Sequence, residues 1–293
     1  MKYFLKKTLL LLLLILLLAI GLELIYDYVY IHANPRNKSE YILQLKNQKI
    51  DYIFFGSSRV KNTIDTKLVE SLTHKKTLNL GIDGAKLDDI LLQLSILLEN
   101  NVKFEKIFIQ IDYSYSYNKY YQIKPVWLPF IHSNKAINDM LKKSDHYFEY
   151  KYIPFYRYMV NDYSIGFREF FFTAINTKSK QNFENGFVPL DEDYSVVKFD
   201  SSPNIVCYNQ FFEKIKQLCL VNKIKVVYFC APFSPDIKNA AMMQKLKKRV
   251  PELVDYSNFF KSTTYFANSN HLNRNGAKII TTDIVNNYIL NEQ

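Results

Sequence analysis

The sequence predicts an α/β protein, a three-layer α/β/α sandwich around a mostly parallel five-stranded sheet, preceded by one N-terminal transmembrane helix. Two observations lead to this prediction. Short apolar segments alternate with segments whose apolar residues recur at helical spacing, which is the pattern of a parallel sheet covered on both faces. The chain also begins with lysines and a long leucine-rich run, which is typical of a membrane helix.

The N-terminal segment predicts a membrane anchor over residues 1–26. Three lysines within the first seven residues precede an unbroken apolar run, Leu9–Leu22, and no small-residue cleavage site follows that run. We therefore expect an uncleaved signal anchor, with a cleaved signal peptide as the alternative. Positive charges stay on the cytoplasmic side, so the rest of the chain would be extracytoplasmic. Residues 27–48 are polar and mixed, and we expect them to form a membrane-proximal linker or a first helix.

The domain that follows, residues 49–293, supplies the alternating pattern. Five segments are expected to be strands: Asp51–Gly56, Thr77–Gly81, Lys106–Asp112, Lys225–Pro232 and Glu252–Ser257. Amphipathic helices are expected over 87–98, over 208–219 and after Asn275, because apolar residues recur there three and four positions apart. In such a sheet the binding groups gather at the carboxyl ends of the strands.

Residues 113–203 interrupt this alternation with aromatic-rich sequence that includes the only tryptophan, Trp127. We expect an insertion or lid over the edge of the sheet. Aromatic rings with polar tips suit carbohydrate stacking, a lipid interface or a partner surface, and they equally suit a plain hydrophobic cap on the core. The sequence leaves these alternatives open.

Composition indicates few further functions. The net charge of +10 suits an acidic partner, but a compositional bias toward lysine explains it as well. An anchor that places the basic domain outside the cytoplasm argues against nucleic-acid binding. The cysteines form no metal or CxxC spacing, and Cys219 and Cys230 are expected to be buried. We expect no cofactor and no metal site, since four histidines lack partners at ligand spacing: His32, His74, His132 and His146.

Three short blocks at strand ends carry the candidate chemistry. "GSSR" follows the first strand, "NLGIDGA" (Asn79–Ala85) ends the second, and "NSNHLNRNGA" precedes the last helix. A serine, a glycine loop and a late histidine are the parts that acyl transfer requires, namely a nucleophile, oxyanion donors and a base.

These blocks resemble those of SGNH (GDSL-type) hydrolases, which have an α/β/α sandwich fold. The resemblance covers Asp51 to about Ala85 and Cys207 to the end, and it implies Ser58 as nucleophile, Gly81 with Ser58 as oxyanion donors, and His271 as base. The layout is similar to that of membrane-anchored bacterial members that transfer D-alanine to lipoteichoic acid or O-acetylate alginate. Such proteins work beside a membrane-bound O-acyltransferase at the cytoplasmic membrane.

The sequence departs from the family pattern at two places. Asn268 stands three residues before the histidine, where the family usually has an orienting Asp, and no Asn follows the third strand. A main-chain carbonyl, or Asp255, is a further candidate for orienting His271. We also consider Arg59, Asn79 and Asp112 as substrate contacts. The alternatives, which the sequence favours, are that Arg59 pairs with a carboxylate and that Asp112 is a structural residue at the end of its strand.

The expected function is an anchored, serine-dependent O-acyltransferase or esterase acting on a cell-envelope polysaccharide or related acyl ester. The alternative is a catalytically inactive subunit of the same fold that binds a glycan or a membrane-bound O-acyltransferase. Asn268 and the missing asparagine favour this alternative, whereas the three blocks together favour the enzyme.

Overall fold

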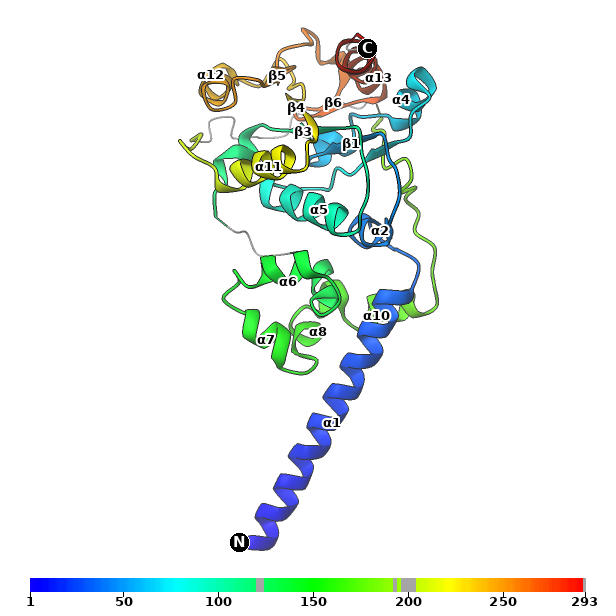
Figure 1. The fold of residues 1–293 in the computed structure, drawn as a ribbon, viewed down its shortest axis with the longest axis vertical. Helices are drawn as coiled ribbons and strands as arrows, with labels where there is room; N and C mark the ends of the chain where they lie inside the picture. The colour runs from blue at the N-terminus through cyan, green and yellow to red at the C-terminus, as the bar shows by residue number, and fades with distance from the viewer. Residues whose placement is uncertain (120–123, 192–193, 196–203, 292–293) are drawn as a thin grey trace. The chain divides into compact units, whose positions relative to one another are not determined.

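The computed structural model describes residues 1–119, 124–191, 194–195 and 204–291, and the chain divides into two compact units (Figure 1). The first unit combines Met1–Gln44 with Tyr120–Lys180. The second combines Leu45–Lys119 with Gln181–Gln293.

The second unit contains the predicted five-stranded parallel sheet. Its strands are β1 (Tyr52–Phe55), β2 (Thr77–Asn79), β3 (Lys106–Gln110), β4 (Lys225–Cys230) and β5 (Val254–Asp255). They run parallel in the order β2-β1-β3-β4-β5. The strands are shorter than predicted at their carboxyl ends. At β3, for example, the Asp112 side chain accepts from the Ser114 N–H and starts a 3₁₀ turn, η1 (Tyr113–Ser116).

The strand order places a topological switch point beside β1. From β1 the chain crosses to β2 on one side and later to β3 on the other, so the loops after β1 and β3 diverge. Such a divergence leaves a crevice at the carboxyl ends of the strands, where open α/β sheets bind ligands. "GSSR" follows β1 and therefore lies at this point.

Helices pack in two pairs. α5 (Leu87–Glu99) packs against α11 (Gln210–Val221), and α4 (Thr66–Thr73) packs against α13 (Arg274–Val285). The two pairs lie on opposite sides of the sheet in Figure 1. Alternate strand residues explain this arrangement. Phe54, Phe108 and Phe229 share one apolar cluster with side chains of α13, whereas their neighbours along each strand point the other way and are also buried.

A two-stranded antiparallel hairpin, β6 (Phe266–Asn268) with β7 (His271–Leu272), precedes α13 and was not predicted. Strands of two or three residues carry no readable periodicity. The remaining elements of the second unit are α3 (Ser58–Lys61), α12 (Ala240–Arg249), η3 (Thr263–Tyr265) and a π-helical turn, η4 (Asn286–Leu290).

Residues 181–191, predicted to be part of the insertion, belong instead to the second unit. The Val188 N–H donates to the Lys61 carbonyl, and the Arg274 N–H donates to the Leu190 carbonyl. Gly186 has φ +69, and a Cβ there would lie 2.1 Å from the Asn79 carbonyl oxygen, so this close approach requires glycine. The segment thereby joins α3 to the start of α13. Predicted insertion residues 196–203 lie outside the described residues.

Of the two alternatives for residues 27–48, a linker or a helix, the structure shows mainly helix. α1 (Lys2–His32) continues well past the apolar run, and α2 (Lys38–Gln44) follows it, so residues 27–48 are mostly helical. The other elements of this unit are η2 (Pro125–Phe130), α6 (Lys135–Leu141), α7 (Tyr147–Tyr152), α8 (Tyr156–Val160), α9 (Asp162–Ile165) and α10 (Phe167–Ala174).

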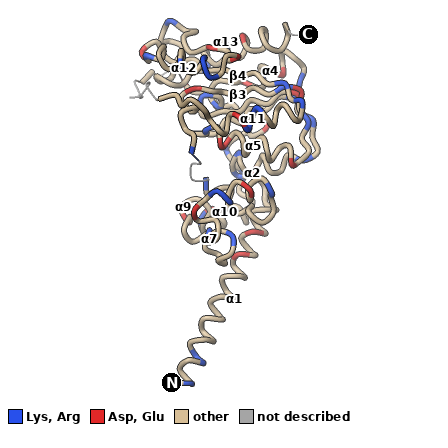
Figure 2. The backbone as a smooth tube through the Cα atoms, turned by 60° about the vertical axis from the view of Figure 1, so that its left-hand side comes forward, with Lys and Arg blue, Asp and Glu red and all other residues tan. Residues whose placement is uncertain are grey.

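α1 is long and apolar enough to cross a membrane, and its two parts have different surroundings. The apolar run is exposed, whereas Tyr26 and Tyr30 are buried by the insertion helices. Tyr26 stacks on Phe170 with ring centroids 3.9 Å apart, and the Tyr30 hydroxyl donates to the Ile165 carbonyl at 3.0 Å. Charged residues of α1 lie at its N-terminal end and in the part that other helices surround (Figure 2).

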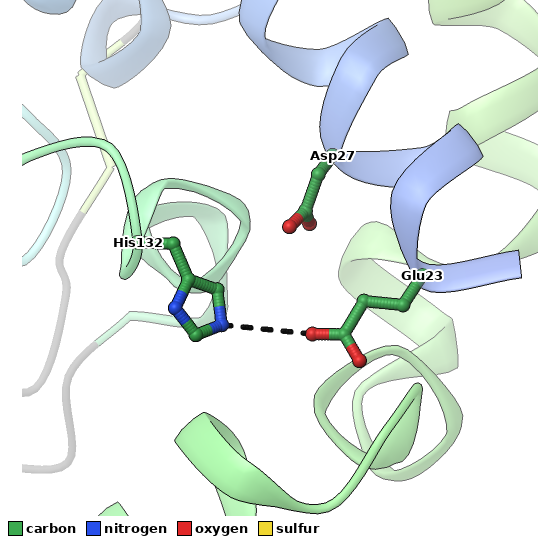
Figure 3. Close-up of side chains that lie close together, drawn as sticks. All are labelled: Glu23, Asp27 and His132. Atoms are coloured by element: carbon green, nitrogen blue, oxygen red, sulfur yellow. Dashed lines mark ion pairs between the residues drawn. The ribbon is translucent and has the colours of Figure 1, made fainter. Parts of the chain in front are cut away.

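An ion cluster around the buried Arg157 joins α1 to the insertion helices. Glu23, Asp27 and His132 lie close enough to share one cation (Figure 3). The Arg157 guanidinium, however, donates to Asp27 at 2.6 and 2.8 Å and also to Glu23, and its side chain is fully buried. The positive charge at these carboxylates is therefore supplied by Arg157. The Tyr158 hydroxyl also donates to Asp27, so α8 is fixed to α1 by two adjacent residues.

Candidate functional site

The turn after β1 fixes the position of Ser58. A Cβ on Gly56 would lie 2.4 Å from Val60 Cγ2 and 2.6 Å from Gln110 Oε1, so the turn fits only glycine there. Ser57 then caps α3, since its Oγ accepts from the Arg59 N–H at 3.2 Å. Ser58 is the first residue of α3, where the backbone N–H has no intrahelical acceptor.

The hairpin between β6 and β7 fixes the position of His271. The Asn268 Oδ1 atom accepts from the backbone N–H groups of Asn270 at 3.0 Å and His271 at 3.1 Å. Two backbone donors on one atom require that atom to be the amide oxygen, because the amide nitrogen cannot accept. The Asn268 side chain thereby folds the tight turn that presents the imidazole.

The structure brings Ser58, His271 and Asn268 into one hydrogen-bonded line, although 213 positions separate the first two. His271 Nε2 lies 2.8 Å from Ser58 Oγ, and His271 Nδ1 lies 3.0 Å from Asn268 Oδ1. Since the amide oxygen only accepts, the proton of the neutral ring resides on Nδ1. Nε2 then presents its lone pair to the serine hydroxyl, which is the arrangement of a nucleophile with its base.

The environment keeps His271 neutral. Burial is the largest cause that lowers the pKa of His271 to about 4; the positive charges of Arg59 and Lys61 act in the same direction, and Asp83 partly offsets them. A neutral ring is the form that accepts a proton. A base with so low a pKa is nevertheless weak, so proton removal from Ser58 is correspondingly slow.

Reactivity of Ser58 should persist into acid. Only neutral His271 accepts a proton, so reactivity falls as pH drops through about 4 rather than through the ordinary histidine value of 6.5. Labelling of Ser58 by a fluorophosphonate, measured between pH 3.5 and 8, should therefore stay near its plateau at about pH 5.5. An inflection of the labelling profile near pH 6.5 would contradict the buried position of the His271 imidazole.

Arg59 and Asp112, considered above as substrate contacts, are instead a buried structural pair. Arg59 Nη1 donates to Asp112 Oδ2 at 2.7 Å, and each side chain is 1% exposed. Arg59 Nη2 also donates to the carbonyls of Ala231 and Pro232 after β4. Its guanidinium stacks on the Phe233 ring, 3.6 Å from the centroid. Of the two alternatives for Arg59, the structure therefore shows the pairing with a carboxylate.

Removal of Arg59 should destabilise the protein. Arg59→Ala leaves Asp112 as an unpaired buried carboxylate, and loss of one partner of a buried pair costs about 3–5 kcal/mol. We expect a lower midpoint in chemical denaturation of the detergent-solubilised chain, and partial recovery in Arg59→Met/Asp112→Leu. Arg249→Ala, at an exposed position, is the control and should change stability by about 0.5 kcal/mol or less.

Asn79 and Gly81 are likewise engaged within the fold. The Asn79 amide donates to the carbonyls of Val60 at 2.9 Å and Ile64 at 2.8 Å, and the side chain is fully buried, so it is no substrate contact. Its Oδ1 accepts from the Gly81 N–H at 3.0 Å. The amide expected to bind an oxyanion is therefore bonded within its own loop. A Cβ on Gly81 would lie 2.8 Å from the Ser57 carbonyl, so this loop packs directly on the serine turn.

Gln110 is a site residue that the sequence analysis did not assign. Its Oε1 accepts from both the N–H and the Oγ of Ser57 at 2.9 Å, and its Nε2 donates to Asp112. Gln110 thus connects the serine turn to the Arg59 pair. A polar residue within the apolar run "IFIQI" was the available signal. Asp255, by contrast, contacts Ser257 and Lys247 and does not orient His271.

The assembled group can accept a proton from Ser58 and return it. It contains a hydroxyl, a neutral imidazole oriented by an amide, and the N-terminal amide of α3. No protein-family model matches the sequence, and no curated protein matches it. Geometry is therefore the basis on which a function can be proposed.

Proposed function

We propose that this protein is a serine-dependent acyltransferase or esterase whose nucleophile is Ser58. The observation that carries the proposal is the hydrogen-bonded line from Ser58 Oγ through His271 to Asn268, at the switch point of the parallel sheet. His271 Nε2 lies 2.8 Å from Ser58 Oγ. A structural role for Ser58 in its turn, or for His271 in its hairpin, does not explain this contact.

The mechanism follows from these contacts. Ser58 Oγ attacks the acyl carbonyl carbon while its proton passes to His271 Nε2, and the carbonyl oxygen becomes an oxyanion near the Ser58 N–H. His271 then gives the proton to the departing oxygen, which leaves an acyl group esterified to Ser58. A sugar hydroxyl or water attacks this ester, His271 takes up the new proton, and Ser58 Oγ recovers it as the product leaves.

The same contacts predict slow turnover. Asn268 orients the imidazole in the correct tautomer but supplies no negative charge to stabilise the imidazolium, and in subtilisin loss of the triad aspartate lowers kcat by about 10⁴. The Gly81 N–H, bonded to Asn79, adds no free second oxyanion donor. Slow transfer to a positioned acceptor fits this site better than rapid hydrolysis.

The sequence resemblance suggests where the enzyme acts. We propose a three-layer sandwich of the SGNH type, held by α1 on the extracytoplasmic side of a bacterial cytoplasmic membrane. The acyl acceptor would be a cell-envelope polysaccharide or a related ester, with a membrane-bound O-acyltransferase as partner. A parallel sheet with helices on both sides and one helix able to span a membrane support this placement.

A second function, binding without catalysis, is favoured by one set of contacts. Asn268 replaces a carboxylate, and the Gly81 amide is already occupied. An inactive subunit of the same fold would use its surface to hold a glycan or a membrane partner. The two functions differ in whether Ser58 is nucleophilic.

A fluorophosphonate probe separates the two functions. We expect the full chain in detergent to be labelled on Ser58, located by peptide mass spectrometry, and Ser58→Ala to remove the label. Ser57→Ala is the matched control, because Ser57 contacts Gln110 rather than His271 and should leave labelling in place. Absence of label on folded protein, after long incubation at pH 8, would favour the binding function.

A further inference from the structure

We propose that the exposed aromatic surface of α7–α10 is immersed in the headgroup region of a phospholipid membrane, beside the point where α1 leaves it. The proposal concerns the first unit alone and rests on α1 spanning the membrane.

Exposed apolar side chains are concentrated in this surface. Among the described residues, nine large apolar side chains between positions 148 and 175 are exposed, against eight in the whole second unit. They include Phe148, Tyr152, Met159, Tyr163, Phe167 and Phe171. Tyr163 is 81% exposed and Phe167 is 68% exposed. Large apolar side chains left exposed in such number on a few consecutive helices favour an interaction site.

The attachment to α1 fixes the depth of this surface relative to the membrane. The apolar run ends at Leu22, and the next charged residue, Glu23, already bonds to Arg157 of α8. Asp27 continues the same cluster one turn later. The insertion helices are therefore fixed to α1 at the position where its lipid-spanning part ends. Leu24 and Tyr28 of α1, beside this attachment along the helix, are also exposed.

Composition favours lipid as the occupant. Tyr and Phe rings suit the boundary between headgroups and acyl chains, and basic side chains beside them attract anionic headgroups. Residues 124–180 contain nine basic side chains against five acidic ones. The attachment to α1 is a second reason to expect lipid at this surface. Lipid that surrounds the end of α1 also reaches the helices that pack against α1. Burial of the exposed aromatic side chains in the membrane would also explain why these helices are attached to the anchor helix.

Depth-dependent quenching tests the proposal. In a Cys207→Ser background, where the remaining cysteines are buried, an environment-sensitive fluorophore is attached at Tyr163→Cys or at Lys135→Cys. Lys135 is the matched control, being exposed on α6, which lies farther than α7 and α8 from the N-terminal end of α1 (Figure 1). The full chain is studied in nanodiscs of phosphatidylcholine and phosphatidylglycerol.

We expect spin-labelled lipid to quench the Tyr163 probe about twofold or more over the Lys135 probe, with a blue-shifted emission. Replacing Phe167 and Phe171 with Ser should reduce this difference. Equal access of both probes to aqueous iodide would overturn the proposal. Shielding that increases with the protein-to-lipid ratio would assign the surface to a second copy, and shielding seen only in native membranes would assign it to a protein partner. Resistance to alkaline extraction tests the anchoring of α1 separately.

Discussion

Asn268→Asp should accelerate the reaction of Ser58 by about 10²–10⁴, a range whose upper end is the loss that removal of the triad aspartate causes in subtilisin. A carboxylate oxygen can accept the three hydrogen bonds that Asn268 Oδ1 accepts now, from two backbone N–H groups and from His271 Nδ1. Its negative charge would also stabilise the imidazolium that forms as Ser58 attacks.

The measurement is the rate of fluorophosphonate labelling at pH 7.5, with the pH profile as a second readout. The wild-type pKa of His271 is about 4, and an adjacent carboxylate raises it, so the acid limb of the variant should move upward. Asn275→Asp makes the same chemical change at an exposed position of α13 and should alter neither quantity. If Ser58 of a folded Asn268→Asp variant were labelled no faster than Ser58 of the wild type, the missing negative charge at position 268 would not be what limits proton removal by His271.

Ser58→Ala and His271→Ala should each lower acyl transfer by about 10². The serine and histidine of a complete triad contribute about 10⁶ to kcat, and the absence of the carboxylate removes about 10⁴ of this. Because the two side chains act as one unit through a single hydrogen bond, the double variant should lose no more than either single variant.

Turnover of an activated aryl acetate by detergent-solubilised protein provides the measurement for all three variants. Losses that multiply in the double variant would mean that Ser58 and His271 act independently. Full activity in Ser58→Ala would remove Ser58 as the nucleophile. Ser57→Ala serves again as the control, with an expected loss of about 1 kcal/mol of stability from the missing cap.

Sequence pattern was informative where burial is periodic. The runs "YIFF", "KIFIQ" and "KVVYFC" became β1, β3 and β4, and the helical spacing from Leu87 predicted α5 almost to the residue. Strand ends were predicted less well, because hydrogen-bonded turns such as that at Asp112 end a strand while its sequence still alternates. The positions of Ser58 and His271 could be predicted, since each lies next to an element with a clear pattern.

Polar partners could not be predicted in the same way. Arg59 and Asp112 were candidates for substrate contact, yet they form a buried pair because the turn after β1 lies beside the end of β3. The Gly81 amide was expected to be free, but Asn79 accepts from it. The type of a side chain limits the partners with which it can form hydrogen bonds. Only the packing of the loops decides which of these partners lies within hydrogen-bond distance.

By itself, the sequence determined a parallel α/β sheet, an apolar N-terminal helix, a serine at the end of the first strand and a histidine just before the last helix. Tertiary structure alone decided that Asn268 orients the ring, that Arg59 is structural, and that the insertion helices form one compact unit with α1. The reason is physical. Hydrophobic periodicity records how one segment is buried, whereas contacts such as Arg157 with Glu23, 134 positions apart, depend on how distant segments meet.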